Sequence, residues 1–303
     1  MPPDSEIEKR VFVVGVPRSG TTLVQSLLAT HSTATSFTES HFFSRHYALL
    51  PLLGTPILTR NPGPRLREFL AENHEPPPAA IDWFDTMGRG ARGGRALLPF
   101  RSRPAARQFL KVLDEVARRR GRSCWIEKTP RHLRYVPLVE RVSGADSGTR
   151  FVHVIRQGLD VVASLREASR SWELRYDLDA CVRRWNADVG FSLRRIGAPS
   201  DLFVFYEELT ARPERTLRRL LAGLGLGWEP EILEEFGHTS GRLITREEEW
   251  KDGVDRAIRR SPNSGASLGD GERERVIRSL EPGLYERVRA SAARRSGESE
   301  GAS

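Results

Sequence analysis

The stretch from Val11 to Leu28, VFVVGVPRSGTTLVQSLL, constrains the fold of this chain more than any other part. It opens with a short apolar run, up to Val16, which predicts a strand buried on both faces. The apolar residues at 23, 24, 27 and 28 have the spacing of a helix with one apolar face. A strand, a tight turn and a helix start predict a phosphate-binding loop, because the free N–H groups and the dipole of the helix N-terminus point into the turn.

The residues of this turn are suited to an anion. Gly20 lets the backbone approach a ligand closely, and three hydroxyl groups can donate hydrogen bonds. These hydroxyl groups belong to Ser19, Thr21 and Thr22. Residues 15–22 read GVPRSGTT, so a threonine replaces the lysine of the nucleoside-triphosphate loop and Arg18 is the strong cation. We therefore expect a 5′-phosphate that carries a second anionic group, with an ordinary β–α turn as the alternative.

The charge of the chain does not indicate nucleic-acid binding. Its formal charge is +8, but only four of the 48 basic residues are lysines, and the enrichment in arginine, alanine, glycine and proline is typical of a GC-rich genome. The arginine runs are Arg118–Arg120, Arg183–Arg184, Arg194–Arg195 and Arg218–Arg219. They are scattered over the predicted helices and do not form one tract, so we interpret them as solvated helix faces, although a positive field would also suit a polyanionic small ligand.

The cysteines and the N-terminus indicate a cytoplasmic protein. Cys124 and Cys181 lie far apart, so they fit neither a metal-binding spacing nor a disulfide framework. The first ten residues, MPPDSEIEKR, contain no apolar signal core, and the longest apolar run is too short to span a bilayer.

Short strands and longer helices alternate along the rest of the chain. Strands are predicted at 123–127, 151–155 and 202–206, and helices at 103–120, 158–168, 178–196 and 213–224. This alternation predicts an α/β fold with a P-loop-type doubly wound parallel sheet flanked by helices. We expect a single domain over residues 1–303, with a flexible polar tail at 291–303.

A second anion-binding group is predicted after the strand at 151–155. A nucleoside triphosphatase would end such a strand in an aspartate that organises magnesium, whereas this strand is followed by Arg156. Ser164 lies about two helical turns into the next helix and can face the same side. An arginine and a serine there would hold a phosphate. The two anion sites together predict a metal-free site for a nucleotide that is phosphorylated at two places.

Four segments together resemble the sulfotransferase family, which uses 3′-phosphoadenosine 5′-phosphosulfate (PAPS). They are PRSGTT at 17–22, KTP at 128–130, VIRQGLDVVAS at 154–164 and VFYEEL at 204–209. The first and third segments are specific when they occur in this order, whereas the other two are weak alone. The match extends from about Val11 to Trp228, with a gap at 41–122, and is closer to the bacterial and tyrosylprotein branch than to the cytosolic steroid and phenol enzymes.

The resemblance implies a role for each of these segments. Residues 18–22 would bind the 5′-phosphosulfate of PAPS, and Arg156 with Ser164 would bind its 3′-phosphate. Tyr206, at the end of the strand at 202–206, is similar to the family tyrosine near the nucleotide. Lys251, in EWKDG, resembles a basic residue of the loop that covers the 3′-phosphate.

Sulfuryl transfer is an in-line displacement in which cations and N–H groups stabilise the developing charge. Arg18 is expected to stabilise the leaving oxygen, and Lys128 to reach the sulfuryl or bridging oxygens. Glu39, in FTES, resembles the base of the tyrosylprotein enzymes, which takes the proton of the acceptor hydroxyl, and His41 is the rival base. The other histidines that we considered are interpreted as structural, namely His31, His132 and His153.

Residues 41–122, rich in proline and glycine at first, are interpreted as a mostly helical or irregular insertion after the first helix. An insertion at this place lies above the carboxyl ends of the strands, which indicates acceptor binding; a surface loop without function is the alternative. Its aromatic residues indicate a partly hydrophobic acceptor, and they include Phe42, Phe43, Tyr47, Trp83 and Phe84.

The sequence thus predicts a PAPS-dependent sulfotransferase that acts on a hydroxyl group of a small molecule, such as a secondary metabolite, a lipid or a sugar. Two alternatives stay open. One is a P-loop kinase of a small molecule that uses ATP and magnesium, and the other is a nucleotide-binding protein without catalytic activity.

Overall fold

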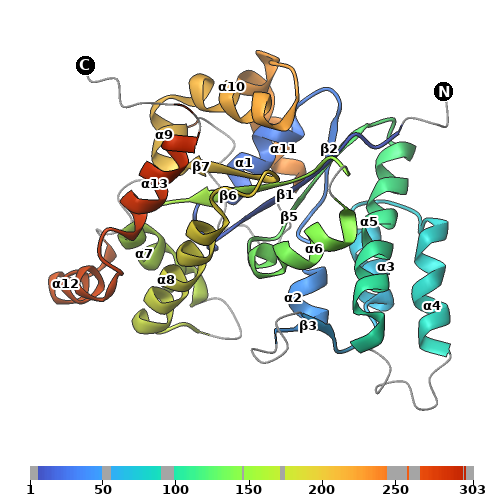
Figure 1. The fold of residues 1–303 in the computed structure, drawn as a ribbon, viewed down its shortest axis with the longest axis horizontal. Helices are drawn as coiled ribbons and strands as arrows, with labels where there is room; N and C mark the ends of the chain where they lie inside the picture. Colours follow the sequence, from blue (N-terminus) through green and yellow to red (C-terminus); the bar gives the residue numbers. More distant parts are fainter. Residues whose placement is uncertain are drawn as a thin grey trace.

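The fold is built on a parallel sheet of five strands in the order β2-β5-β1-β6-β7 (Figure 1). The computed structural model describes residues 6–49, 56–89, 99–144, 147–170, 175–243, 258, 267–295 and 297. The strands of the sheet are β1 (Lys9–Gly15), β2 (Ala34–Ser36), β5 (Cys124–Lys128), β6 (Thr149–Ile155) and β7 (Asp201–Phe205). A separate antiparallel pair consists of β3 (Tyr47–Ala48) and β4 (Ile57–Leu58). The prediction of a parallel α/β sheet is confirmed.

Helices precede and follow these strands along the chain. The α-helices of the described residues are α1 (Thr21–Ala29), α2 (Phe42–His46), α3 (Gly63–Glu72), α4 (Asp82–Arg89), α5 (Ser102–Arg119), α6 (Val136–Ser143), α7 (Gly158–Ser169), α8 (Leu178–Arg195), α9 (Tyr206–Ala211), α10 (Pro213–Leu224), α11 (Glu231–Leu243), α12 (Asp270–Ser279) and α13 (Leu284–Arg295). Short 3₁₀ helices lie at Ala79–Ile81, Pro99–Arg101 and Pro130–Tyr135. Within the parts of the chain that the structure describes, no helix combines the length and apolar character needed to cross a bilayer.

Strand β1 lies in the middle of the sheet and is buried on both faces. Val11 and Val13 belong to the core on one face, whereas Phe12 and Val14 belong to the core on the other. All four side chains are at most 1% exposed. Because strands of this kind contact apolar groups on both sides, the sequence is continuously apolar there and does not alternate.

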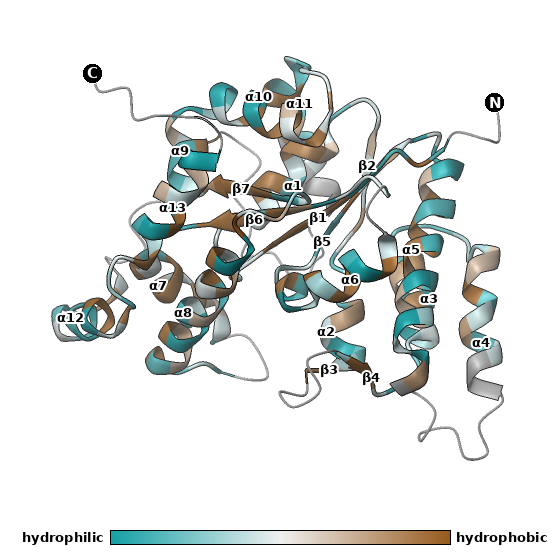
Figure 2. Ribbon diagram, viewed as in Figure 1, coloured by the Kyte–Doolittle hydropathy of each residue, from teal (hydrophilic) through white to brown (hydrophobic). Residues whose placement is uncertain are grey.

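Helices cover both faces of the sheet. Figure 1 shows α10 and α11 on one side of the strands and α5, α6 and α8 on the other. Figure 2 shows the strands mostly in the hydrophobic colour, with teal patches on the outward surfaces of the helices. Helices α7, α8, α12 and α13 contribute to a third apolar cluster, which also includes Ile155 of β6 and Phe205 of β7. This arrangement is the doubly wound sheet that the sequence predicts.

Three sequence predictions differ from the structure. Strand β2 was missed, because its three residues, ATS, give too short a pattern to identify a strand. The insertion at 41–122 therefore follows β2 and not α1. Tyr206 is the first residue of α9 and not the last of β7. The predicted flexible tail begins too early, because 291–295 complete α13 and Ala292 is buried.

The insertion forms part of the core. Phe42, Phe43, Tyr47 and Phe84 are at most 5% exposed and belong to the same apolar cluster as the Phe12 side chain of β1. These four rings therefore pack against the protein interior and do not support the inference of a hydrophobic acceptor. A role of the segment in acceptor binding stays a prediction that needs other residues.

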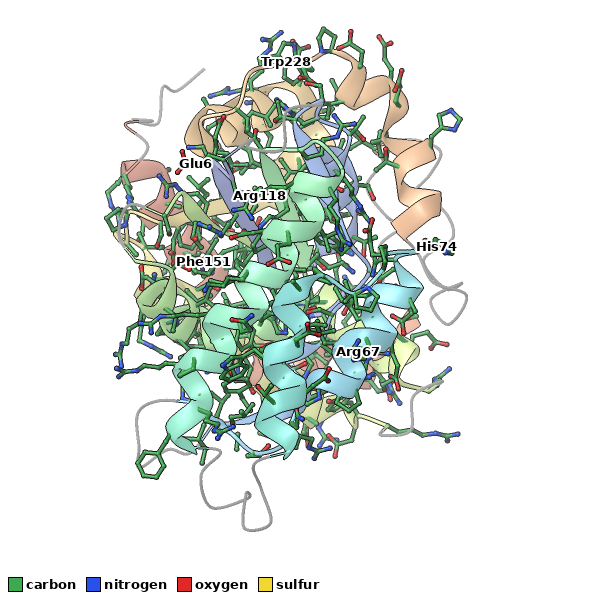
Figure 3. All side chains as sticks on the ribbon, turned by 90° about the vertical axis from the view of Figure 1, so that its right-hand side faces the viewer. Glu6, Arg67, His74, Arg118, Phe151 and Trp228 are labelled. Atoms are coloured by element: carbon green, nitrogen blue, oxygen red, sulfur yellow. The ribbon has the colours of Figure 1, made fainter. Side chains whose placement is uncertain are left out.

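The arginine runs are distributed over α5, α8 and α10. Arg118, labelled in Figure 3, lies on the exposed side of α5. Arg195 of α8 pairs with Asp201 at 2.7 Å, and Arg219 of α10 pairs with Glu208 at 3.1 Å. Much of the positive charge is thus balanced locally by carboxylates.

The packing of the insertion gives a first prediction. The ring of Phe109 in α5 is fully buried and stacks on the ring of Phe42, with centroids 4.1 Å apart and an interplanar angle of 10°. We expect Phe109→Ala to lower the free energy of unfolding by about 3–5 kcal/mol, because it leaves a cavity in the core. The control is Phe100→Ala, which removes a side chain that is 82% exposed and should change stability by less than about 0.5 kcal/mol. If urea denaturation shows that Phe109→Ala lowers the free energy of unfolding no more than the expected small change of the control, the insertion is not part of the cooperative core.

Candidate active site

The predicted site residues follow the carboxyl ends of the strands. The loop at 18–22 follows β1, Glu39 follows β2, Lys128 ends β5, Arg156 follows β6 and Tyr206 follows β7. Because all five strands are parallel, these ends lie at one edge of the sheet. Ligands of open α/β sheets bind at this edge. Residues that are far apart in the sequence are therefore brought to one place.

The loop after β1 has the geometry of an anion cradle. Gly20, the N-cap of α1, has a φ of 97°, and in the described part of the chain no side chain caps this helix. A Cβ atom at this position would lie 2.5 Å from the Tyr206 ring, so only glycine fits. The hydroxyl of Ser19 is buried and, among the described residues, has no hydrogen-bond partner. Since buried polar groups are normally hydrogen-bonded, this hydroxyl is suited to a ligand.

Arg156 lies beside this cradle with part of its guanidinium group unsatisfied. Its Nη1 donates to the carbonyl of Arg18 at 3.4 Å, and its Cζ atom lies 4.3 Å from the centre of the Tyr206 ring. Its Nη2 is 3.7 Å from a carboxylate oxygen of Asp160. Nevertheless, Nε and Nη2 are buried without a hydrogen-bond partner among the described residues. Two such donors on a buried guanidinium group fit a phosphate.

The two predicted anion-binding sites are connected by a hydrogen bond that the sequence analysis did not predict. Ser164 was expected to act with Arg156, but its hydroxyl accepts a hydrogen bond of 3.0 Å from the Nε atom of Arg18. Arg18 also has a left-handed backbone, with a φ of 75°. The role of Ser164 toward a 3′-phosphate stays a prediction. Lys251, the remaining predicted residue, lies outside the described residues.

A carboxylate and an ammonium group meet at the ends of β2 and β5. The Nζ atom of Lys128 donates to Glu39 Oε1 at 2.5 Å, and the other oxygen of Glu39 is 3.5 Å from Nε2 of His41. Lys128 is 2% exposed, whereas Glu39 is 15% and His41 is 28% exposed. Glu39 therefore lies between a buried cation and a more accessible imidazole, and a substrate can reach its carboxylate more easily than the lysine.

Burial lowers the pKa of His41 to about 4, although the nearby Glu39 carboxylate acts in the opposite direction. Arg45 lowers the pKa further. His41 is thus neutral near pH 7, but so low a pKa makes it a weak base. The interpretation of the other histidines as structural stays a prediction. His153, for example, is fully buried and contacts Ser192 and Asp201 at 3.0 Å each.

Sequence analysis missed a buried carboxylate beneath this pair, that of Glu127. It is fully buried and is bound by Ser40, Thr129 and His132. Burial raises the pKa of a carboxyl group, but the His132 ring and the hydrogen bonds from Thr129 and Ser40 outweigh burial and hold the pKa of Glu127 below its ordinary value. The sequence signal that could have identified this residue is a single glutamate that follows the apolar residues CWI inside a predicted buried strand.

A comparison with known protein families agrees with this geometry. Residues 10–230 match the sequence model described as the sulfotransferase family, a range that includes the predicted site residues except Lys251. The chain belongs to the sulfotransferase family. The match includes the insertion at 41–122 as well as the five strands of the sheet.

Curated relatives and solved structures from this family are similar to the chain. A protein-tyrosine sulfotransferase of Drosophila melanogaster is 26% identical over 235 residues, which are 75% of this chain and 40% of that protein. Protein-tyrosine sulfotransferase A of Caenorhabditis elegans is 22% identical over 74% of this chain and 51% of its own length. The chain thus spans about half or less of these relatives. The sulfotransferase domain of the Synechococcus PCC 7002 olefin synthase has the same fold, with a TM-score of 0.55, 18% identity and coverage of 92% of this chain and 96% of that domain.

The low pKa of His41 gives a second prediction. Between about pH 6.5 and pH 4 the unfolded chain protonates this imidazole and the folded protein does not, so acid lowers stability. Moving from pH 8 to pH 5 should destabilise the parent protein by about 2 kcal/mol more than His41→Asn. Asparagine suits the φ of 50° at this position. Parallel pH dependence of the two proteins in urea denaturation would contradict the lowered pKa of His41.

Proposed function

We propose that the chain is a PAPS-dependent sulfotransferase that transfers a sulfuryl group to a hydroxyl group of its acceptor without a metal ion. The observation that carries this proposal is the buried guanidinium of Arg156, with two unsatisfied donors, beside the anion cradle at 18–22. A nucleotide with anionic groups at two positions fits these two groups of donors. The ion pair of Glu39 and Lys128 at the same sheet edge adds the groups that the transfer needs.

Different residues of the chain are proposed to bind different parts of PAPS. Gly20, Thr21 and Thr22 would bind the 5′-phosphosulfate through the N–H groups at the start of α1, and Ser19 would add its buried hydroxyl. Arg156 would bind the 3′-phosphate, with Lys251 as the predicted covering residue. Tyr206 supports both groups, because its ring contacts Gly20 and the Arg156 guanidinium group.

In the reaction, a bond forms between the acceptor oxygen and sulfur while the bond from sulfur to the bridging oxygen breaks. Arg18 would stabilise the charge that develops on the leaving oxygen, and Lys128 the charge on the sulfuryl or bridging oxygens. Glu39 would take the proton of the acceptor hydroxyl. For Lys128 to act in this way, its hydrogen bond to Glu39 lengthens as the donor and acceptor bind.

The acceptor is proposed to be a small molecule with a hydroxyl group. The curated relatives are named protein-tyrosine sulfotransferases, so a phenolic hydroxyl is a suitable first probe. A panel of 4-nitrophenol, a tyrosine-containing peptide, a primary alcohol and a sugar covers the classes that the sequence leaves open.

The role of Arg156 gives a third prediction. Arg156→Ala should weaken binding of adenosine 3′,5′-bisphosphate by roughly 30-fold or more, because it removes charge-assisted hydrogen bonds. Binding of adenosine 5′-monophosphate should change far less. Titration calorimetry measures both ligands, with ATP and magnesium as a third. Equal losses for the first two ligands would contradict the 3′-phosphate role, and tight binding of ATP only with magnesium would favour the kinase alternative.

The proposed base gives a fourth prediction. Glu39→Gln should lower kcat by about 10²–10⁴-fold, because an amide cannot accept the proton, and should leave bisphosphate binding nearly unchanged. Transfer of ³⁵S-labelled sulfate from PAPS to the acceptor panel measures turnover, with His41→Asn as the comparison variant. If Glu39→Gln leaves turnover unchanged and His41→Asn lowers it, His41 and not Glu39 is the general base. No transfer by the parent protein to any member of the panel would favour the non-catalytic alternative.

A further inference from the structure

One buried carboxylate organises the segment that carries the proposed base. The side chain of Glu127 in β5 is fully buried. Its Oε1 accepts hydrogen bonds from the Ser40 hydroxyl at 2.7 Å and from the Thr129 hydroxyl at 2.6 Å. Its Oε2 lies 3.0 Å from Nδ1 of His132. The side chains of Ser40, Thr129 and His132 thus all contact the Glu127 carboxylate.

The same three side chains bind the backbone next to Glu39. The N–H of His41 donates to the Thr129 hydroxyl at 3.3 Å, and the N–H of Phe42 donates to the Ser40 hydroxyl at 3.3 Å. The N–H of Phe43 donates to Nε2 of His132 at 3.2 Å. These three N–H groups are consecutive and lie at the start of α2.

The hydrogen-bond directions follow from these contacts. Because Nε2 of His132 accepts from Phe43, the ring hydrogen is on Nδ1 and points to Glu127. Each hydroxyl accepts from a backbone N–H and donates its own hydrogen to Glu127. Both oxygens of this carboxylate therefore act only as acceptors, which an ionised glutamate can do and an amide cannot.

We propose that Glu127 is a positioning residue: through Ser40, Thr129 and His132 it fixes the backbone of residues 40–43 on the end of β5, and so holds the Glu39 carboxylate beside Lys128. This inference rests on the proposed role of Glu39 as the base. The segment needs such a support because His41 has a left-handed φ of 50°, a conformation that costs free energy in a residue other than glycine.

Glu127→Gln is the most direct test, because it keeps the shape of the side chain. Its amide NH₂ would take the place of one of the two oxygens, and two hydrogen-bond donors would then face each other. The conflict would be either with the hydroxyl hydrogens of Ser40 and Thr129 or with the Nδ1 hydrogen of His132. A change of His132 tautomer would relieve the second conflict, but then Nε2–H would face the N–H of Phe43. At least one of the three links is therefore lost in this variant.

The first readout is independent of any activity. In hydrogen–deuterium exchange, the amides of residues 41–43 should exchange roughly 10-fold faster or more in Glu127→Gln than in the parent protein. Unchanged exchange at these amides would overturn the inference, whether or not the protein transfers sulfate. If the parent proves inactive, the proposed function fails, and the exchange result still decides whether Glu127 holds this segment.

The second readout separates positioning from general stability. With ³⁵S-labelled PAPS and 4-nitrophenol, Glu127→Gln should lower kcat by about 10–100-fold, while binding of adenosine 3′,5′-bisphosphate changes by less than about twofold. In a Glu39→Gln background the same substitution should cause almost no further loss, because the base that it positions is already absent. A loss of equal size in both backgrounds would show that Glu127 does not act through Glu39.

A matched pair of variants at Thr129 tests the inference even if Glu127→Gln does not fold. Thr129→Val removes one hydroxyl link with little change of shape, whereas Thr129→Ser keeps it. We expect faster exchange at the His41 amide and a lower kcat for the valine variant, with both values restored toward the parent in the serine variant. Equal behaviour of the two variants in both measurements would overturn the inference.

Discussion

The parallel pairing of β1 with β5 and β6 is the constraint on which the site depends. It sets the carboxyl ends of three central strands at one edge, with Val13 beside Lys128 on one side and beside Val152 on the other. The residues that follow β1 then lie beside those that follow β5 and β6, although more than a hundred positions separate them in the sequence. Apolar packing on both faces of β1 holds this register, because a shift by one residue would move its side chains from the core on one face to the core on the other.

Close packing at this edge explains the residue types that are found there. The Tyr206 ring lies against Gly20, and the Arg156 guanidinium group lies over the same ring. A ring face attracts a cation and does not satisfy its N–H donors, so the guanidinium group is held in place while two of its nitrogens keep no hydrogen-bond partner among the described residues. The protein thus holds a buried guanidinium group in a fixed orientation, as the proposed phosphate site requires.

Sequence analysis predicted the fold, and it named residues that the structure places at one edge of the sheet, for a physical reason. A cationic residue at or shortly after the end of a buried strand gives a clear local signal, and Arg18, Lys128 and Arg156 all have this pattern. Burial in the insertion depends on contacts between distant segments, so the rings of Phe42 and Phe84 were assigned to a binding surface when they lie in the core. The network around Glu127 joins residues 40 to 132, and no local pattern predicts such a connection.

The insertion cannot be treated as an exchangeable loop. Because residues 41–122 supply much of the apolar cluster against one face of the sheet, exchanging the whole segment would replace much of that cluster. Redesign of acceptor choice therefore has to proceed by single substitutions at exposed positions. The same coupling means that changes in this segment are limited by the need to preserve aromatic stacking such as that of Phe42 on Phe109.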